Sequence, residues 1–495
     1  MARDGFHVIC LYGTINTAGL MTQFRTLEAL RGPKLVLVDY ALPEAERHRL
    51  ACAVKRKDSG VNSLCLVLDR VLLCYLANHY NELSVNRTLM AAGMPFAFHQ
   101  PYVPDSVNLL PDEMFIGRQT ELSKIIDPAG VNLVYGGRQL GKSALLKKAC
   151  RDTDKNQGSR AVYVDLKTAR TVGEAALALS RALVMNRILP KGSETDNWDA
   201  LAYALRTRLM VLEEGQEPIA YLLVLLDEAD SFILDSARCD YQPIDLLKAI
   251  QQDLPGRFKF VLAGLHNVVR FKRRQALGSN SGIPHLPFLN VTPFDSDDAL
   301  SLLIGPLGFL GFALENEALA SEILATTNYF PGLIQLYGKK LVESIRDEDY
   351  ADYSVGETPP YVITDDHLRH VLSDSDFVKE LRSKLEMTLR LDEKDEGGGY
   401  YEAIALLIAG RDHADQAEGG YSAELLHEDG KNLLPRRMGE LKAEQVATLL
   451  EELCDLNILR ELGQGTYVFS SKRFRDLMGT ADEIFERMEE MEGEG

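Results

Sequence analysis

The segment from Leu133 to Lys148, LVYGGRQLGKSALLKK, constrains the fold of this chain more than any other. A short apolar run leads into Gly136, and a Gly-Lys-Ser triplet at 141–143 then opens a helical pattern, so the spacing GxxxxGK[ST] stands between a strand and a helix. Glycines let the backbone wrap closely around a phosphate group, while backbone N–H groups and the helix N-terminus point at the anion. The segment therefore predicts a phosphate loop in a parallel α/β sheet.

This loop supplies most of the candidate nucleotide-binding residues. They are Gly136, Gly137, Arg138, Gln139, Leu140, Gly141, Lys142, Ser143 and Ala144. In a loop of this kind Lys142 reaches the β- and γ-phosphates of ATP, and the hydroxyl of Ser143 is a ligand of Mg²⁺. The expected ligands are therefore ATP or ADP together with Mg²⁺.

A second apolar run, YLLVLLDEAD, ends in Asp227 and Glu228. The carboxyl end of a buried strand is the edge at which open α/β sheets bind their ligands. We expect Asp227, with Ser143, to hold the Mg²⁺, and Glu228 to polarise the attacking water. With Lys142, this acidic pair predicts a site able to hydrolyse ATP.

The apolar run FKFVLAGL is followed by His266 and Asn267. In a phosphate-loop ATPase whose sheet inserts a strand between the strands of the two motifs, such an end lies near the γ-phosphate. Asn267 would then orient the attacking water, although ordinary loop polarity explains the same residues.

A basic cluster comes next in the chain. It consists of Arg270, Lys272, Arg273 and Arg274. One of these arginines, with Arg273 as the candidate, would stabilise transition-state charge in a neighbouring subunit. A solvated helix face and a nucleic-acid contact remain open as alternatives.

The composition describes a globular chain. Its 495 residues are 46% hydrophobic, enough for several domain cores, and the formal net charge of -19 argues against coating nucleic acid or an anionic membrane by bulk attraction. The seven cysteines form no metal-ligand spacing, and apolar runs stay short of a membrane span. We expect a cytoplasmic protein with no membrane partner.

Four domains are expected from the periodicity of the sequence. They are a small α/β domain of unknown role at 1–105, a phosphate-loop core at 106–292, a helical lid at 293–392 and a winged-helix domain with an acidic tail at 393–495. In the first, the apolar runs FHVICLYG, KLVLVDYA, SLCLVLD and PFAFHQPY predict strands. The acidic tail DEIFERMEEMEGEG is expected to fray.

The winged helix is predicted from three helical patterns followed by RELGQGTYVFS, a hairpin with a Gly-Gln-Gly turn. Its third helix, KAEQVATLLEELCDLNIL, is acidic, which is the wrong sign for a helix that reads a DNA groove. The segment SSKRFRDLM, with Lys472, Arg473 and Arg475, is the exception and would touch a nucleic-acid backbone. A protein-facing or autoinhibitory role is favoured over DNA binding.

These motifs carry a family resemblance. The segments FIGRQTEL, GGRQLGKSALL, VLLDEAD, FVLAGL and NYFPGLIQLYG resemble the AAA+ superfamily, in particular its STAND-type and archaeal origin-recognition-like branch, over about Met114 to Met478. The resemblance implies an α/β P-loop NTPase core with a helical lid and a C-terminal winged helix. It also implies that Phe115, Gly117 and Arg118 line the adenine pocket and that Pro331 contacts the nucleotide.

One departure from the family pattern bears on activity. No arginine follows Pro331 where a lid sensor arginine normally stands; Gln335, Lys339 and Lys340 are found instead. A lysine is a point charge without the bidentate fork of arginine. Fast, ring-type hydrolysis is therefore not expected.

These sequence features are compatible with three functions. The favoured one is a slow, regulated ATPase that acts as a STAND-type switch in bacterial signalling or antiviral defence, with a homo-oligomer or protein partner in the ATP state. The alternative is a DNA-acting AAA+ ATPase of the origin-recognition or transposition-helper kind. A scaffold with a dead nucleotide site is the third, and the intact residues Lys142, Ser143, Asp227 and Glu228 oppose it.

Overall fold

The computed structural model divides into two compact units, Met1–Gly117 with Phe294–Lys379, and Arg118–Pro293 with Glu380–Gly495. We call them the first and the second unit. The residues that the structure describes are 5–13, 19, 32–43, 46–47, 65–79, 85–96, 100–104, 112–210, 218–265, 267–271, 285–346, 360–392, 398–414, 419–463 and 465–493. The four domain boundaries expected from the sequence stay predictions.

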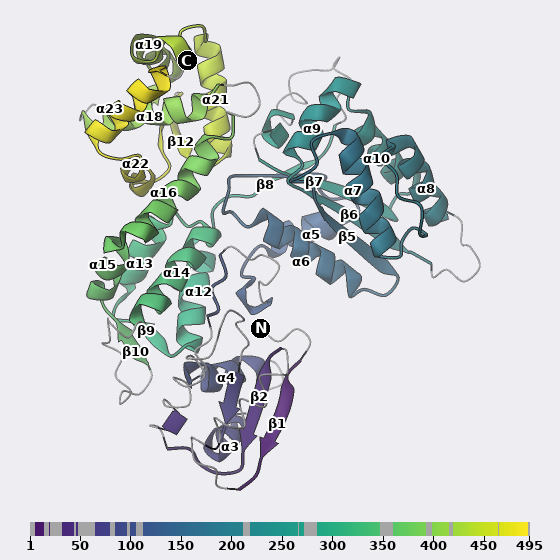
Figure 1. The fold of residues 1–495 in the computed structure, drawn as a ribbon, viewed down its shortest axis with the longest axis vertical. Coiled ribbons are helices and arrows are strands. Elements are labelled where there is room, and N and C mark those ends of the chain that lie inside the picture. The colour runs from purple at the N-terminus through teal and green to yellow at the C-terminus, as the bar shows by residue number, and fades with distance from the viewer. Residues whose placement is uncertain are drawn as a thin grey trace. The chain divides into compact units, whose positions relative to one another are not determined.

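A parallel sheet of five strands forms the centre of the second unit (Figure 1). Across the sheet the strands are β5 (Ser159–Asp165), β6 (Tyr221–Asp227), β7 (Phe258–Ala263), β4 (Leu133–Tyr135) and β8 (Phe288–Asn290). The first four correspond to the apolar runs in the sequence, and β7 lies between the phosphate-loop strand β4 and the acidic-pair strand β6, as expected. β8 is an addition that no run of apolar residues signalled.

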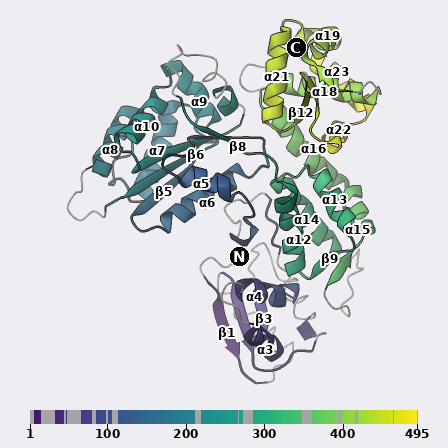
Figure 2. The ribbon, with the colours of Figure 1, turned by 180° about the vertical axis from the view of Figure 1, so that it is seen from behind.

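Helices cover both faces of this sheet. They are α5 (Gln119–Ile126), α6 (Lys142–Asp154), α7 (Val172–Met185), α8 (Trp198–Met210), α9 (Asp230–Ser236) and α10 (Gln242–Asp253). Leu222, Val224 and Leu226, two apart on β6, share one buried cluster with α7, α8 and α10. α6 packs on β5 and β6 through buried side chains outside that cluster and so covers the opposite face (Figure 2). Continuous apolar strands are what such a two-sided sheet requires.

The second unit also contains a winged helix. Its parts in chain order are α18 (Tyr400–His413), β11 (Tyr421–Ser422), α19 (Ala423–Leu433), α20 (Pro435–Met438), α21 (Ala443–Asp455), β12 (Leu459–Gly463), β13 (Thr466–Phe469) and α22 (Lys472–Leu477). The strands pair antiparallel in the order β11-β13-β12. The three helices and the hairpin thus agree with the sequence.

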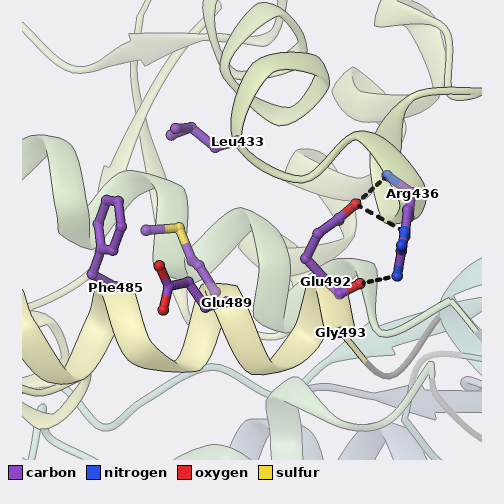
Figure 3. Close-up of a pocket in the computed structure, with 7 residues that line it drawn as sticks. Leu433, Arg436, Phe485, Glu489, Glu492 and Gly493 are labelled. Atoms are coloured by element: carbon purple, nitrogen blue, oxygen red, sulfur yellow. Dashed lines mark hydrogen bonds and ion pairs between the residues drawn. The ribbon is translucent and has the colours of Figure 1, made fainter.

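The acidic tail is a helix, contrary to the fraying expected from the sequence. α23 (Ala481–Gly493) buries Ile484 and Met488, one turn apart, and packs on α18. Near its end, the backbone amide of Arg436 donates to Glu492 at 2.7 Å (Figure 3). Most acidic side chains of this segment are exposed, so its composition concealed a short apolar stripe.

The first unit begins with a small α/β arrangement. Its elements are β1 (His7–Leu11), β2 (Lys34–Val38), β3 (Cys65–Leu68), α3 (Arg70–Asn78) and α4 (Val85–Gly93). The strands pair in parallel in the order β1-β2-β3, and they correspond to three of the apolar runs that were expected to be strands. The run PFAFHQPY is not a strand where the structure describes it: Met94–Phe96 is a 3-10 helix, and 100–103 is irregular, while 97–99 lie outside the described residues.

Helices dominate the rest of the first unit. They are α12 (Ser296–Phe309), α13 (Glu317–Thr326), α14 (Pro331–Ile345), α15 (Asp365–Ser373) and α16 (Ser375–Leu389), the last of which crosses into the second unit. Two short parallel strands, β9 (Phe312–Leu314) and β10 (Tyr361–Ile363), accompany them. Tyr102 anchors the N-terminal part here, because its buried hydroxyl donates to the carbonyl of Leu303 at 2.7 Å.

Candidate nucleotide-binding and catalytic site

The phosphate loop joins the end of β4 to the start of α6. Gly136 has a φ of 148° and Gly141 a φ of 86°, both in the region that favours glycine. A side chain at residue 136 would also collide with the backbone carbonyl of Val291. α6 begins at Lys142, so the loop residues from Gly136 to Ala144 surround a helix N-terminus, the place where backbone amides bind anions. Their contact with nucleotide stays a prediction.

The lysine of the loop is buried in the loop itself. Lys142 Nζ donates to the carbonyl of Gly136 at 2.9 Å and to that of Gly137 at 2.7 Å. Burial lowers the pKa of Lys142 to about 8, while the carboxylates of Glu228 and Asp227 oppose this shift. The ammonium group is therefore held by neutral carbonyls, and phosphate oxygens would be stronger partners for it.

The acidic pair stands at the carboxyl end of β6, as predicted. Asp227 is buried, and its two oxygens accept the amide of Glu228 at 3.0 Å and the hydroxyl of Tyr163 at 2.7 Å. Tyr163 lies on the neighbouring strand β5, and the ammonium of Lys147 stands 4.8 Å from the centre of its ring. Sequence reasoning missed Tyr163, because only the register of β5 on β6 brings it to Asp227.

Glu228 has an unusual backbone conformation and a shifted side-chain pKa. Its φ of 51° is in the left-handed region, which a residue with a side chain adopts at a conformational cost, often at functional sites. Burial, and then the neighbouring Asp227 carboxylate, raise the pKa of Glu228, against the positive charges of Lys142 and Arg138. A carboxylate of raised pKa is a better proton acceptor, as the predicted role requires.

Asp230 ties the acidic pair to the end of β7. Its carboxylate accepts the backbone amides of Leu265 at 2.8 Å and Asn267 at 2.9 Å. Asn267 is buried, with 5% of its surface exposed. His266 lies outside the described residues. Asp230 is the last residue of the sequence motif DEAD, but the motif alone does not show that the Asp230 carboxylate positions Asn267.

A cavity of about 760 Å³ opens beside these groups. Its lining includes Arg138 from the phosphate loop, Glu228 and Asp230 from the end of β6, and Asn267 after β7. The structure thereby brings together three of the predicted site residues that are far apart in the sequence. Space next to a carboxylate and an amide is what an attacking water and a transferring phosphoryl group need.

The residues expected at the adenine are divided between the two units. Phe115 and Gly117 end the first segment of the first unit, and Pro331 is the first residue of α14 in that unit. Arg118 belongs to the second unit, with a guanidinium that donates to Glu121 at 2.9 Å and to the carbonyl of Thr292. A contact of any of them with the base stays a prediction.

The basic cluster is only partly described. Arg273, the candidate arginine finger, lies outside the described residues together with Lys272 and Arg274. Arg270 is described, and its Nε donates to Glu452 of α21 at 3.3 Å. The carboxylate of Glu452 is buried and also accepts the hydroxyl of Tyr401 at 2.6 Å. One arginine of the cluster therefore contacts the winged helix.

The winged helix also reaches the phosphate loop. A Cβ atom at Gly137 would collide with the backbone carbonyl of Leu456, the residue that caps the C-terminus of α21. The carboxyl end of this helix thus abuts the loop that is expected to hold phosphate. A helix C-terminus carries partial negative charge on its unpaired carbonyls.

The donors present suit Mg²⁺. In the part of the chain that the structure describes, no group of three or more His, Cys, Asp and Glu side chains gathers to hold a metal ion. Mg²⁺ beside a nucleotide needs no such cage, because it takes one or two protein oxygens together with phosphates and waters. Ser143 at the start of α6 and Asp227 at the end of β6 offer those oxygens. Among the described helices, none is long and apolar enough to cross a membrane.

Comparison with known proteins gave structural likenesses only. No protein-family model matches the chain, and no curated protein matches its sequence. Solved structures that match include a Walker-type ATPase of Pyrococcus abyssi, 15% identical over 74% of this chain and 97% of that one, with a TM-score of 0.47. The ORC2 protein of Aeropyrum pernix is 17% identical over 76% and 90%, with a TM-score of 0.43. The ORC1 protein of the same organism, in complex with DNA, is 16% identical over 77% and 96%, with a TM-score of 0.39.

At TM-scores below 0.5 these likenesses add no weight, so the assignment rests on the chain's own geometry. β7 separates the phosphate-loop strand from the acidic-pair strand, and the order β5-β6-β7-β4-β8 is parallel throughout. A helical segment and a winged helix follow this sheet along the chain. The chain therefore has the α/β fold of the AAA+ P-loop ATPases, and a helical segment and a winged helix follow the core along the sequence.

Proposed function

We propose that this chain binds ATP with Mg²⁺, hydrolyses it slowly and uses the nucleotide as a switch of the STAND type. The observation that carries the proposal is the contact between the carboxyl end of α21 and the phosphate loop at Gly137. An ATPase that only couples hydrolysis to mechanical work does not need a winged helix in contact with its phosphate loop. A switch does, because the position of one domain must change with the phosphates that are bound.

The catalytic steps follow from the positions of the side chains. Lys142 exchanges the carbonyls of its own loop for the outer phosphates, and Ser143 with Asp227 holds Mg²⁺. Glu228, whose pKa is raised by burial, accepts a proton from the attacking water, which Asn267 orients across the shared cavity. Tyr163 keeps Asp227 in place through its hydroxyl.

The switch follows from charge. The carbonyl of Leu456 and the C-terminus of α21 bring partial negative charge to Gly137. A γ-phosphate adds negative charge to the same region, so ATP favours a state in which α21 has withdrawn, whereas ADP tolerates its presence. The Arg270–Glu452–Tyr401 contact holds α21 in the closed state.

The wider role is proposed from the resemblance. A switch of this kind exposes a surface to another copy of the chain or to a protein partner when ATP is bound, and hydrolysis resets it. Bacterial signalling or antiviral defence is the proposed setting. The absence of an arginine from the first turns after Pro331 supports slow turnover.

Two variants test the switch. Lys142→Ala is expected to abolish nucleotide binding, because it removes the cation of the loop. Glu228→Gln is expected to keep ATP binding, to lower the rate constant of hydrolysis by about 10²–10⁴-fold and to accumulate the ATP state. Size-exclusion chromatography with light scattering should then show a larger assembly for Glu228→Gln with ATP than with ADP.

Asp165→Asn is the matched control, since Asp165 is an exposed acid that lies beside Asp227 on the neighbouring strand. It should hydrolyse ATP and elute like the unmodified chain. Identical elution of Glu228→Gln with ATP and with ADP, while ATP is shown to be bound, would contradict the switch.

A DNA-acting ATPase is the second candidate. It is favoured by one feature, the basic residues Lys472, Arg473 and Arg475 at the start of α22. Arg475, however, donates to Asp476 at 3.0 Å, so part of that charge is already paired. The third helix of the winged helix, α21, is acidic at Glu444 and Glu451.

A further inference from the structure

We infer that Arg138 is a catalytic residue, whose guanidinium contacts the γ-phosphate from within the same chain and stabilises the charge that develops during hydrolysis. The inference rests on the proposed ATPase function and deepens it. It assigns to a residue of the phosphate loop the task that the sequence reserved for Arg273 of a neighbouring subunit.

The side chain of Arg138 is partly buried and has no hydrogen-bond or ion-pair partner in the part of the chain that the structure describes. Its Nε is fully buried without a hydrogen bond, and among the described residues its guanidinium makes no hydrogen bond or ion pair. A buried donor without a partner costs about 1–3 kcal/mol, more when the group is charged. Such a group is rare in native proteins, and a ligand that binds at that place explains its retention.

The residues around Arg138 indicate which ligand its guanidinium would bind. Arg138, Glu228 and Asn267 line one cavity of about 760 Å³. The expected base and the expected water-orienting amide therefore face the same space as the free guanidinium. The positive charge of Arg138 also lowers the pKa values of both Lys142 and Glu228, which shows that it stands within electrostatic reach of each.

The other cations of this cavity are less suited. Arg390 donates to Glu402 at 3.2 Å and is committed to that buried carboxylate. Lys167 and Arg170 also line the cavity, but both are exposed, so solvent screens their charge. Arg138 alone of the four combines a buried donor with a place inside the phosphate loop.

The chemistry balances without any further reactant. The oxygen of water forms a bond to the γ-phosphorus, its proton passes to Glu228, and the bond from that phosphorus to the bridging oxygen breaks, which yields ADP and inorganic phosphate. Negative charge grows on the leaving oxygen and spreads over the equatorial oxygens. Arg138 transfers no proton; it offers a planar, permanently charged fork to two of those oxygens.

The test separates transition-state contact from ground-state binding. Arg138→Ala should lower the rate constant of ATP hydrolysis by about 10²–10³-fold or more, the range for loss of one charged donor to the transition state. Its Kd for ADP should stay within about threefold of that of the unmodified chain, because ADP lacks the γ-phosphate that Arg138 is inferred to contact. The complex of ADP with aluminium fluoride, which imitates the transferring phosphoryl group, should lose at least the same factor in affinity as the rate loses.

Two further variants sharpen the result. Arg138→Lys keeps the charge but not the fork, so it should recover only part of the rate and of the aluminium fluoride affinity. Arg170→Ala removes an exposed charge from the rim of the same cavity and should leave both quantities within about threefold, because exposed charges act weakly. Thermal unfolding confirms that each variant is folded.

Three outcomes overturn the inference. Hydrolysis by Arg138→Ala at the unmodified rate is one, and an equal loss of affinity for ADP with and without aluminium fluoride is another, because it places Arg138 in ground-state binding. An effect of Arg170→Ala as large as that of Arg138→Ala is the third. If the unmodified chain itself turns over no ATP in a single-turnover assay, the proposed function fails first and takes the inference with it.

Discussion

Lys142 is a charged side chain in a place that disfavours charge. Its ammonium is enclosed by the phosphate loop and bonded only to neutral carbonyls, and burial lowers its pKa to about 8. The unfolded chain keeps the ordinary lysine pKa of about 10.5, so between about pH 8 and that value the unfolded state binds more protons than the folded state. In that window this group makes the free energy of unfolding rise with pH.

Nucleotide binding should show the opposite trend. Phosphates require a protonated Lys142, so above pH 8 the free protein must take up a proton when it binds ADP or ATP. The Kd for ADP should be insensitive to this group below pH 7 and rise by up to about tenfold per pH unit above pH 8. Calorimetry in buffers of different ionisation enthalpy measures the proton uptake directly.

A Kd for ADP that stays constant from pH 7 to 9.5 would contradict this linkage. The exposed Lys155 provides the control, because Lys155→Met removes an exposed ammonium group from the other end of α6. Its Kd should rise with pH as in the unmodified chain.

Single residues of the site were predictable where a spacing encodes them. The phosphate loop and the acidic pair are contiguous motifs whose chemistry depends on order along the chain, and the structure places them at adjacent strand ends. Tyr163 and Asp230 were missed, because each acts through a partner that only strand register or a loop brings near. Arg138 was expected to bind nucleotide, but its unpaired state is visible only in three dimensions.

At the scale of elements, buried strands were the easiest to predict and short or amphipathic pieces the hardest. β6 and β7 are continuous apolar runs because helices cover both of their faces. β8 has three residues, too few to show a periodic pattern in the sequence. It is recognised as a strand because it pairs with β4. α23 is acidic overall, yet Ile484 and Met488 repeat at helical spacing.

The buried face of α23 yields a stability prediction. Ile484→Ala removes a side chain that is 1% exposed against α18 and should lower the free energy of unfolding of the winged helix by about 2–4 kcal/mol. Urea denaturation followed by circular dichroism measures the change.

The neighbouring residue is the natural control. Phe485 is 57% exposed at the rim of the cavity in Figure 3, so Phe485→Ala should change the free energy of unfolding by only about 0.5 kcal/mol. Equal effects of the two substitutions would mean that α23 does not pack as described.

At the scale of the whole molecule, charge decides between the two candidate functions. The chain carries a net charge of -19, and α21, the third of the expected helices of its winged helix, exposes the carboxylates of Glu444 and Glu451. Duplex DNA repels both, and the basic residues of α22 are few. The fold of the AAA+ ATPases is shared by switches and by DNA-acting proteins, so the fold does not distinguish the two functions. The charges on the surface do.

We expect no salt-sensitive binding of duplex DNA by the full chain, with ATP or with ADP. Fluorescence anisotropy between 50 and 200 mM salt, with up to about 100 µM protein so that ordinary non-specific affinities are covered, tests this. Binding that weakens steeply with salt, with a slope that becomes shallower in Arg473→Ala and Arg475→Ala, would support the DNA-acting alternative instead.

Gly137 has a consequence for how this chain tolerates change. The phosphate-loop spacing leaves that position open to any residue. Here the carbonyl of Leu456 stands where a side chain would begin, so the amino acid at 137 is dictated by the winged helix and not by the nucleotide. Any substitution of Gly137 alters the contact between the phosphate loop and the winged helix, while the residues that define the phosphate-loop motif stay the same. A motif search would therefore score the altered chain as unchanged.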